Sequence, residues 1–115
     1  MQLWHNPVCS KSNGAKDILD GRGVRYAERR YVEQPPTAGE LDAVLTALGM
    51  QPWELARLSE PVAAALGLAS WPHDRERWIA AMVEHPVLIE RPILVADDGR
   101  AVLGRPPELI EQLLR

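Results

Sequence analysis

The amino-acid sequence predicts an α/β fold, with a mixed four-stranded sheet and a helical insertion at about residues 37–84. Three observations support this prediction. A strand, a helix and a second strand follow one another over residues 1–32, an order that implies a right-handed crossover and parallel pairing. Residues 93–103 contain two short apolar runs around the turn Asp97-Asp98-Gly99, which is typical of an antiparallel hairpin. The stretch between these units has helical patterning and no strand pattern.

The N-terminal unit begins with the short apolar strand Met1–Trp4. A helix is expected over residues 12–20, because apolar residues recur on one of its faces. Gly21 and Gly23 follow it, as is typical of a helix C-terminus. The second strand is expected over Val24–Val32, which alternates loosely and contains two tyrosines.

The insertion is expected to contain helices only. Thr37 and Glu40 are spaced as a capping box, and the apolar residues that follow recur at i, i+3, i+4 and i+7, the pattern of an amphipathic helix. Three further helical segments are expected, at residues 52–57, 61–66 and 75–84. Asp74 is suited to cap the last of them.

The C-terminal unit is expected to add the strands Ile93–Val95 and Arg100–Leu103, followed by a helix whose first residue is Pro107. The predicted order is therefore β-α-β, helices, β-β-α. Two halves of this kind form the mixed four-stranded sheet of a thioredoxin-like arrangement. No internal repeat or linker divides the chain, so a single domain is expected over residues 1–115.

Composition and charge narrow the possible classes of function. The net charge is −3 and the pI is near 5.6, which argues against a nucleic-acid-binding face. No apolar run approaches the roughly 20 residues that cross a bilayer, and the N-terminus lacks a signal-peptide core. The single cysteine cannot form an internal disulfide. We therefore expect a cytoplasmic protein without membrane association, in which any second thiol comes from another molecule.

The only cysteine, Cys9, lies on the predicted turn between the first strand and the first helix. Ser10 and Ser12 are both suited to cap that helix. Unpaired backbone N–H groups and the helix dipole favour a thiolate at this place, and Lys11 adds a positive charge. These features predict a nucleophilic cysteine. The alternative is a small buried apolar residue, the more common role of a lone cysteine in an intracellular domain.

Three arginines lie at predicted breaks rather than within helices, namely Arg57, Arg91 and Arg105. Arg91 precedes Pro92 at the entry to the third strand, where a proline is often cis. In a thioredoxin-like sheet this loop lies beside the cysteine turn. Arginines that converge there would bind a tetrahedral oxyanion and favour the thiolate. The alternative is that all three are solvated surface residues.

His5 precedes Cys9 by four residues and could pair with the thiolate or order the turn. A purely structural hydrogen bond is the alternative. We expect no metal site, because Cys9 and the three histidines (His5, His73 and His85) match no zinc-ligand spacing.

Four segments occur in a distinctive order: His5-Asn6-Pro7-Val8-Cys9-Ser10-Lys11-Ser12, the helical insertion, Glu90-Arg91-Pro92-Ile93 and Gly104-Arg105-Pro106. In this order and at these intervals they resemble the glutaredoxin-coupled arsenate reductase family. The resemblance covers essentially the whole chain, and it is strongest to members with a short C-terminus.

The resemblance implies two groups of site residues. The catalytic group would be Cys9 as the nucleophile, His5, and Ser12 within hydrogen-bond reach of the sulfur. The oxyanion-binding group would be Arg57, Arg91 and Arg105, with Pro92 as a cis proline. Asn13 takes the place of the family's arginine four residues after the cysteine, so we expect weaker activation of the thiolate.

The implied reaction is the reduction of arsenate to arsenite. The resemblance implies glutathione as the external thiol, glutaredoxin as the protein partner and no tightly bound cofactor. One alternative is a glutathione-linked thiol oxidoreductase without arsenate activity. Another is a regulator similar to the Spx-type transcription factors, but their Cys-x-x-Cys switch cannot form here because Ser12 occupies the second position.

Overall fold

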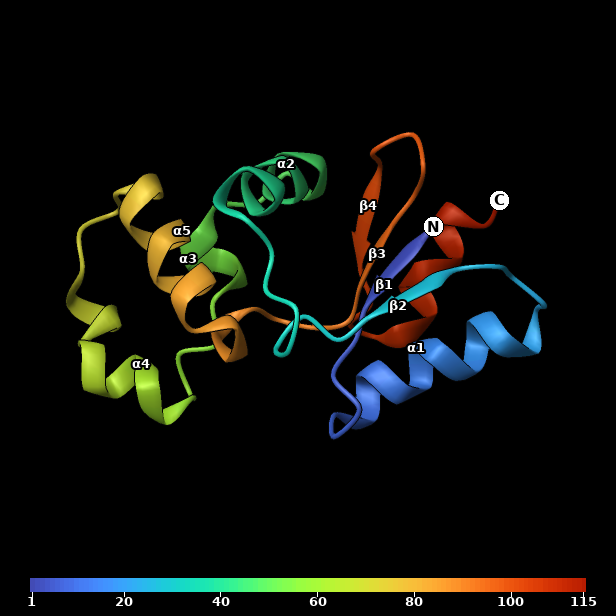
Figure 1. Ribbon diagram of the computed structural model, residues 1–115, viewed down its shortest axis with the longest axis horizontal. Helices are drawn as coiled ribbons and strands as arrows, with labels where there is room; N and C mark the ends of the chain where they lie inside the picture. Colours follow the sequence, from blue (N-terminus) through green and yellow to red (C-terminus); the bar gives the residue numbers. More distant parts are fainter.

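The computed structural model describes residues 1–115 and contains one mixed four-stranded sheet (Figure 1). The strands are β1 (Gln2–Trp4), β2 (Ala27–Arg29), β3 (Ile93–Val95) and β4 (Ala101–Leu103). Their order across the sheet is β2-β1-β3-β4. β1 pairs in parallel with β2, while the β1–β3 and β3–β4 pairs are antiparallel. The predicted α/β class and thioredoxin-like sheet are confirmed.

The helices lie on the two sides of this sheet. The α-helices are α1 (Ser10–Gly21), α2 (Ala38–Leu48), α3 (Pro52–Leu55), α4 (Pro61–Leu66) and α5 (Arg75–Glu84). The 3₁₀-helices are η1 (Leu68–Ser70), η2 (Pro86–Leu88) and η3 (Pro107–Leu113). Figure 1 shows α2 to α5 gathered at one end of an elongated molecule that measures 42 × 27 × 22 Å, with the sheet, α1 and the C-terminal segment at the other.

The two faces of the sheet bury different apolar clusters. Leu3 and Leu94, paired across β1 and β3, belong to a cluster shared with α1 and η3. Trp4 and Ile93, one register position further, belong to a larger cluster shared with the insertion. Successive strand residues point to opposite faces, so even three-residue strands serve both clusters. The loop that carries Cys9 leaves the sheet directly after Trp4.

The predicted helix starts in the insertion are confirmed. The Thr37 hydroxyl accepts the Glu40 N–H at 3.1 Å, and the Glu40 carboxylate accepts the Thr37 N–H at 3.0 Å. At the start of α5, the Asp74 carboxylate accepts the Arg77 N–H at 3.3 Å. Both caps satisfy backbone N–H groups that have no partner within the helix.

The first helix begins two residues earlier than predicted. α1 begins at Ser10, and the N-cap residue is Cys9 rather than either serine. The Asn13 N–H donates to the Cys9 carbonyl at 3.0 Å, which is the first helical hydrogen bond. The sequence rules favour serine as a cap because its hydroxyl accepts an N–H group. Here no side chain caps the first N–H groups of α1, and those of Lys11 and Ser12 act on the Cys9 thiol.

Three other elements differ in extent or type from the prediction. α3 ends at Leu55 rather than at residue 57, because Ala56 leaves the helix and forms a bridge with Ile89. β2 covers three residues instead of Val24–Val32, because its parallel partner β1 is itself only three residues long. The last helix, η3, has 3₁₀ rather than α geometry, with the Leu109 N–H donating to the Pro106 carbonyl three residues earlier. A 3₁₀ run of seven residues is uncommon, because this geometry is used mostly in pieces of three or four residues.

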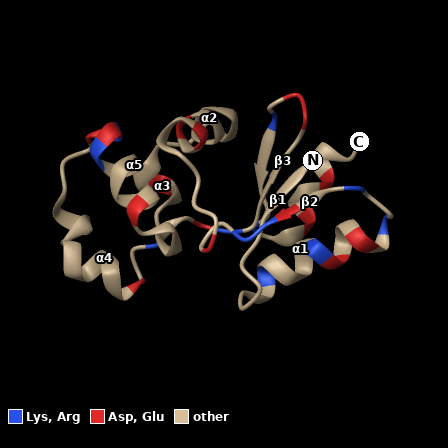
Figure 2. Ribbon diagram, viewed as in Figure 1, with Lys and Arg blue, Asp and Glu red and all other residues tan.

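Charges of both signs are interspersed along α1 and α5 (Figure 2). None of the helices has the length and apolar content that crossing a lipid bilayer requires.

Candidate active site

The loop between β1 and α1 holds Cys9 at the N-terminus of the helix. Cys9 has extended backbone angles (φ −99°, ψ 123°), and its side chain is partly exposed. Its N–H donates to the Asn6 carbonyl at 3.1 Å, which closes a tight turn before the helix. The Asn6 side chain accepts the Val8 N–H at 3.1 Å and holds the same turn from within. Hydrogen bonds within the loop therefore fix the loop conformation and, with it, the position of Cys9.

The environment of the Cys9 thiol favours its ionised form. Partial burial raises the pKa of the thiol. The Ser12 N–H group, the Arg91 guanidinium and the Lys11 N–H group outweigh this effect, so the pKa lies below the ordinary value for cysteine. Free N–H groups at a helix N-terminus and a nearby guanidinium are the surroundings that make a cysteine reactive.

His5 and Ser12 form a buried pair beneath the loop. His5 Nδ1 lies 2.7 Å from Ser12 Oγ, and the same oxygen accepts the Asn6 N–H at 3.0 Å. Ser12 is fully buried and His5 is 2% exposed. Burial lowers the pKa of His5, which keeps the ring neutral. The Ser12 side chain thus contacts the histidine and the loop backbone, while its N–H group faces the sulfur.

Asn13 contacts the loop backbone rather than the thiol. Its Nδ2 donates to the Pro7 carbonyl at 2.9 Å. This hydrogen bond ties the first turn of α1 to the loop before Cys9, and it brings no positive charge to the sulfur.

Of the three arginines, Arg91 is the one that lowers the pKa of the Cys9 thiol, and its side chain is buried. It is 8% exposed, and its Nη1 atom lies 3.4 Å from the Val87 carbonyl and 3.7 Å from Glu60 Oε1. Its Nε atom is buried without a hydrogen-bond partner. A buried charged donor without a partner is costly, so an acceptor that reached this N–H group would remove that cost. The Arg91–Pro92 bond is cis, as expected from the sequence, and so is Arg105–Pro106.

The Tyr31 hydroxyl packs against this arginine. It donates to the Ile89 carbonyl at 3.1 Å, and Tyr31 is fully buried. Burial raises the pKa of Tyr31 to about 12, despite the nearby Arg91. The hydroxyl therefore stays neutral and fixes the backbone just before Glu90 and Arg91.

Backbone contacts bring Arg57 from the insertion to this place. Ala56 and Ile89 form an isolated antiparallel bridge. On either side of it, the Arg57 N–H donates to the Leu88 carbonyl at 2.7 Å and the Glu90 N–H donates to the Leu55 carbonyl at 3.1 Å. The end of α3 is thereby fixed alongside the segment that precedes β3.

Arg105 reaches the same place from the exit of β4. The Gly104 N–H donates to the Pro92 carbonyl at 2.8 Å, and a Cβ atom at Gly104 would lie 2.9 Å from Pro92 Cγ. Only glycine allows this approach. Beside this close contact between Gly104 and Pro92, Arg105 Nη1 donates to the Arg91 carbonyl at 2.9 Å.

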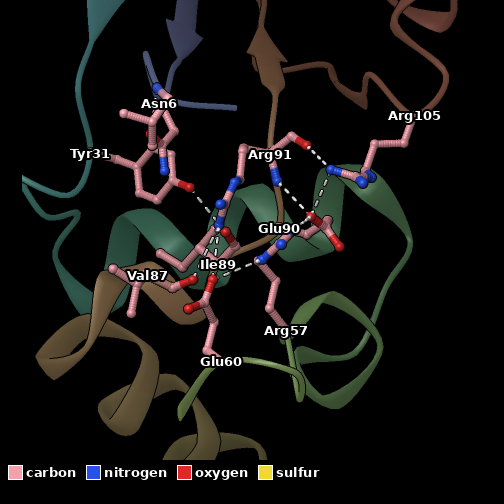
Figure 3. Close-up of polar contacts among 10 residues, drawn as sticks. Asn6, Tyr31, Arg57, Glu60, Val87, Ile89, Glu90, Arg91 and Arg105 are labelled. Carbon is pink, nitrogen blue, oxygen red and sulfur yellow. Dashed lines mark hydrogen bonds and ion pairs between the residues drawn. The ribbon is translucent and has the colours of Figure 1, made fainter. Parts of the chain in front are cut away.

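Two carboxylates that sequence reasoning missed join the three arginines (Figure 3). Glu90 contacts Arg57 Nη1 and lies 3.0 Å from Arg105 Nη1. Glu60 lies 3.3 Å from Arg57 Nε. The sequence offered a weak signal for Glu60, which follows Arg57 at the helical spacing i+3. It offered none for the contact between Arg57 and Glu90, which are 33 residues apart.

The structure thus brings the three predicted arginines into one cluster and places one of them, Arg91, beside the predicted nucleophile. A groove of about 280 Å³ runs along the loop that precedes Cys9 and is lined in part by Val8 and Val32, which are 88% and 38% exposed. No group of three or more His, Cys, Asp or Glu side chains is arranged to hold a metal ion. The exposed His73 instead stacks on Trp53, with ring centroids 4.2 Å apart.

Comparison with known proteins gives consistent matches over nearly the full length. The chain matches the model of the ArsC family over residues 4–113. An uncharacterized protein in the glnII region of Streptomyces viridochromogenes is 45% identical over 117 residues, which cover 99% of this chain and 98% of that protein. An arsenate reductase of Neisseria meningitidis is 36% identical over 115 residues, with 99% and 97% covered. A solved arsenate reductase from Vibrio cholerae has a TM-score of 0.87 at 37% identity, with 99% and 96% covered.

Proposed function

Because the chain belongs to the ArsC family, as its motifs predicted, we propose that it reduces arsenate to arsenite with Cys9 as the nucleophile. One observation carries the proposal: a thiol of lowered pKa lies at a helix N-terminus next to Arg91, whose buried Nε has no partner in the protein. A thiolate and a free guanidinium N–H side by side suit the attack of sulfur on an oxyanion.

In the proposed first step, the Cys9 thiolate attacks arsenic and forms an S–As bond. One arsenate oxygen takes up protons from solvent and leaves as water, so arsenic remains As(V). The Ser12 N–H and Arg91 hold the thiolate before attack. Arg57, Arg91 and Arg105 neutralise the oxyanion, whose charge grows as the bond forms. His5 and Ser12 keep the loop in position.

In the second step, the thiolate of glutathione attacks the Cys9 sulfur. An S–S bond forms, the electron pair of the S–As bond stays on arsenic, and arsenite leaves as As(III). A glutaredoxin thiolate then attacks the glutathione sulfur and releases the Cys9 thiolate. The chain has one cysteine, so both other thiols must come from outside it.

A coupled assay tests this proposal. Purified protein is mixed with glutathione, glutaredoxin, glutathione reductase and NADPH, and arsenate-dependent NADPH oxidation is followed. The wild type should consume NADPH only when arsenate is present, and Cys9→Ser should abolish the activity. An assay in which arsenate changes nothing, with active glutaredoxin shown by a separate disulfide substrate, would refute the proposal.

A second candidate is a glutathione-linked thiol oxidoreductase without arsenate activity. The observation that favours it is Asn13, whose side chain binds the Pro7 carbonyl and adds no charge at the sulfur. If the protein exchanges disulfides with glutathione in a Cys9-dependent manner but leaves arsenate unchanged, this second function replaces the first.

A further inference from the structure

The Glu90 carboxylate occupies the centre of the arginine cluster. A single oxygen, Oε1, contacts Arg57 Nη1, lies 3.0 Å from Arg105 Nη1 and accepts the Arg91 N–H at 3.3 Å. These three donors come from the end of α3, the entry to β3 and the exit of β4. Figure 3 shows the carboxylate between the side chains of Arg57 and Arg105.

This arrangement matches what an oxyanion oxygen needs. Guanidinium and backbone N–H groups that converge on one negatively charged oxygen are the usual donors to a bound oxyanion. The proposed function assigns Arg57 and Arg105 to the arsenate, yet in the free protein Glu90 already holds both. The Nη1 N–H groups that point at Glu90 are not available to the arsenate while Glu90 holds them.

The second carboxylate of the cluster is held less closely. Glu60 Oε1 lies 3.3 Å from Arg57 Nε and 3.7 Å from Arg91 Nη1, and no backbone N–H group donates to it. With both carboxylates ionised, three guanidinium charges are reduced to a single net positive charge. The charge that faces an incoming dianion is therefore set as much by the glutamates as by the arginines.

We infer that Glu90 is an internal competitor of the oxyanion, and that it thereby sets the affinity of the site for its substrate. The inference rests on the proposed function for the identity of the substrate, but its anion-binding part does not depend on turnover. The oxyanion binds Arg57 and Arg105 when the Glu90 side chain rotates away from them. Glu90 is a positioning residue, because it acts through the two arginines.

The Glu90 side chain has a route out of the cluster. It is 23% exposed, so rotation about its side-chain bonds brings the carboxylate into water. The guanidinium groups remain paired with an anion before and after the exchange. A tetrahedral dianion brings more charge and more acceptor oxygens than a carboxylate does, whereas a monovalent halide brings no more charge and no acceptor oxygen. The competitor therefore favours divalent tetrahedral oxyanions over other anions.

The test measures sulfate binding by titration calorimetry at constant ionic strength. Sulfate is a tetrahedral dianion that Cys9 does not reduce under these conditions. Glu90→Gln keeps the size of the side chain and removes its charge. We expect the Kd for sulfate to fall by about tenfold, which corresponds to about 1.4 kcal/mol. The control is Glu84→Gln, an exposed glutamate at the end of α5, which should leave the Kd unchanged.

The opposite result would show a different role. If Glu90 only holds the arginines in place, Glu90→Gln will loosen them and weaken sulfate binding. An unchanged or higher Kd in folded Glu90→Gln protein overturns the inference. A wild-type measurement covers the case of a variant that does not fold: the ¹³C carboxylate resonance of Glu90 should shift on saturation with sulfate, and a resonance that stays in place overturns the inference as well.

Arsenate reduction kinetics then distinguish a failure of this inference from a failure of the proposed function. If the wild type reduces arsenate, Glu90→Gln should lower KM for arsenate by about the same factor as the sulfate Kd, without raising kcat. A wild type that does not reduce arsenate refutes the proposed function, while tighter sulfate binding by Glu90→Gln would still support the competitor. A wild type that reduces arsenate, with Kd and KM unchanged in Glu90→Gln, refutes only the competitor.

Discussion

Ser12 Oγ lies 2.7 Å from His5 Nδ1, and both side chains are buried directly beneath the loop that presents Cys9. This contact joins the end of β1 to the first turn of α1. Since Ser12 Oγ also accepts the Asn6 N–H, one hydroxyl satisfies two groups that water does not reach.

Replacing this hydroxyl should destabilise the protein and slow the reaction of the thiol. Ser12→Ala leaves the Asn6 N–H and His5 Nδ1 without their partner, which should cost about 1–3 kcal/mol in urea unfolding. Ser10→Ala is the matched control, because Ser10 is exposed in the same helical turn and should change stability by less than about 0.5 kcal/mol. Equal stabilities for the two variants would contradict the role given to Ser12.

The reactivity of Cys9 should depend on pH through Arg91. The depressed pKa of the thiol means that thiolate persists to lower pH, so the alkylation rate should rise with pH around a midpoint below that of an unperturbed cysteine. Arg91→Met removes a positive charge beside the sulfur, and the midpoint should then move to higher pH. Iodoacetamide kinetics measure this shift at the only cysteine.

The control for that experiment is Arg100→Met. Arg100 is exposed in the β3–β4 turn, where it pairs with Asp98 at 2.8 Å, and its loss should leave the midpoint unchanged. The same midpoint in the wild type and in Arg91→Met would exclude Arg91 as a cause of the lowered pKa.

The Tyr31 hydroxyl should contribute to stability. Tyr31→Phe leaves the buried Ile89 carbonyl without its donor, and the loss should be about 1 kcal/mol in urea unfolding. The Tyr26 hydroxyl instead contacts Asp20 near the surface, so Tyr26→Phe should lose less. A larger loss for Tyr26→Phe than for Tyr31→Phe would be inconsistent with this assignment.

Gly104 should not tolerate a side chain. A Cβ atom there would meet Pro92 Cγ at 2.9 Å and Ile110 Cγ2 at 3.0 Å. Gly104→Ala should therefore cost about 1–3 kcal/mol and weaken anion binding, since it separates Arg105 from Arg91. Gly21→Ala is the control: no atom lies within 4 Å of its Cβ, and alanine should gain up to about 1 kcal/mol in a helix. Thermal unfolding and sulfate titration measure both effects.

Local sequence patterns predicted most of the fold. The order of elements, the sheet class and the capped starts of α2 and α5 follow from short-range signals such as Thr37 with Glu40. The start of α1 was wrong by two residues, since serine is the usual cap and here Cys9 takes that place. The extent of β2 was wrong as well, because strand length depends on the partner strand and not on local alternation.

The candidate site was less accessible to sequence reasoning. The cysteine turn and the three arginines could be identified because each lies at a break between elements. The roles of Glu60 and Glu90 could not be predicted, because the residues next to a carboxylate in the sequence do not indicate its ion-pair partner. Arg57 and Glu90 meet only after the insertion has packed against the segment before β3. The direction of the Ser12 side chain was equally hidden, since it depends on where His5 is buried.

The bridge between Ala56 and Ile89 connects the insertion to the segment that enters β3. Arg57 belongs to the insertion, whereas Arg91 and Arg105 flank the strands, so an anion held by all three would link the two ends of the molecule. The two amides beside the bridge, those of Arg57 and Glu90, should then exchange with deuterium more slowly when sulfate is bound. The exchange rates of these two amides would thus report whether an anion occupies the site.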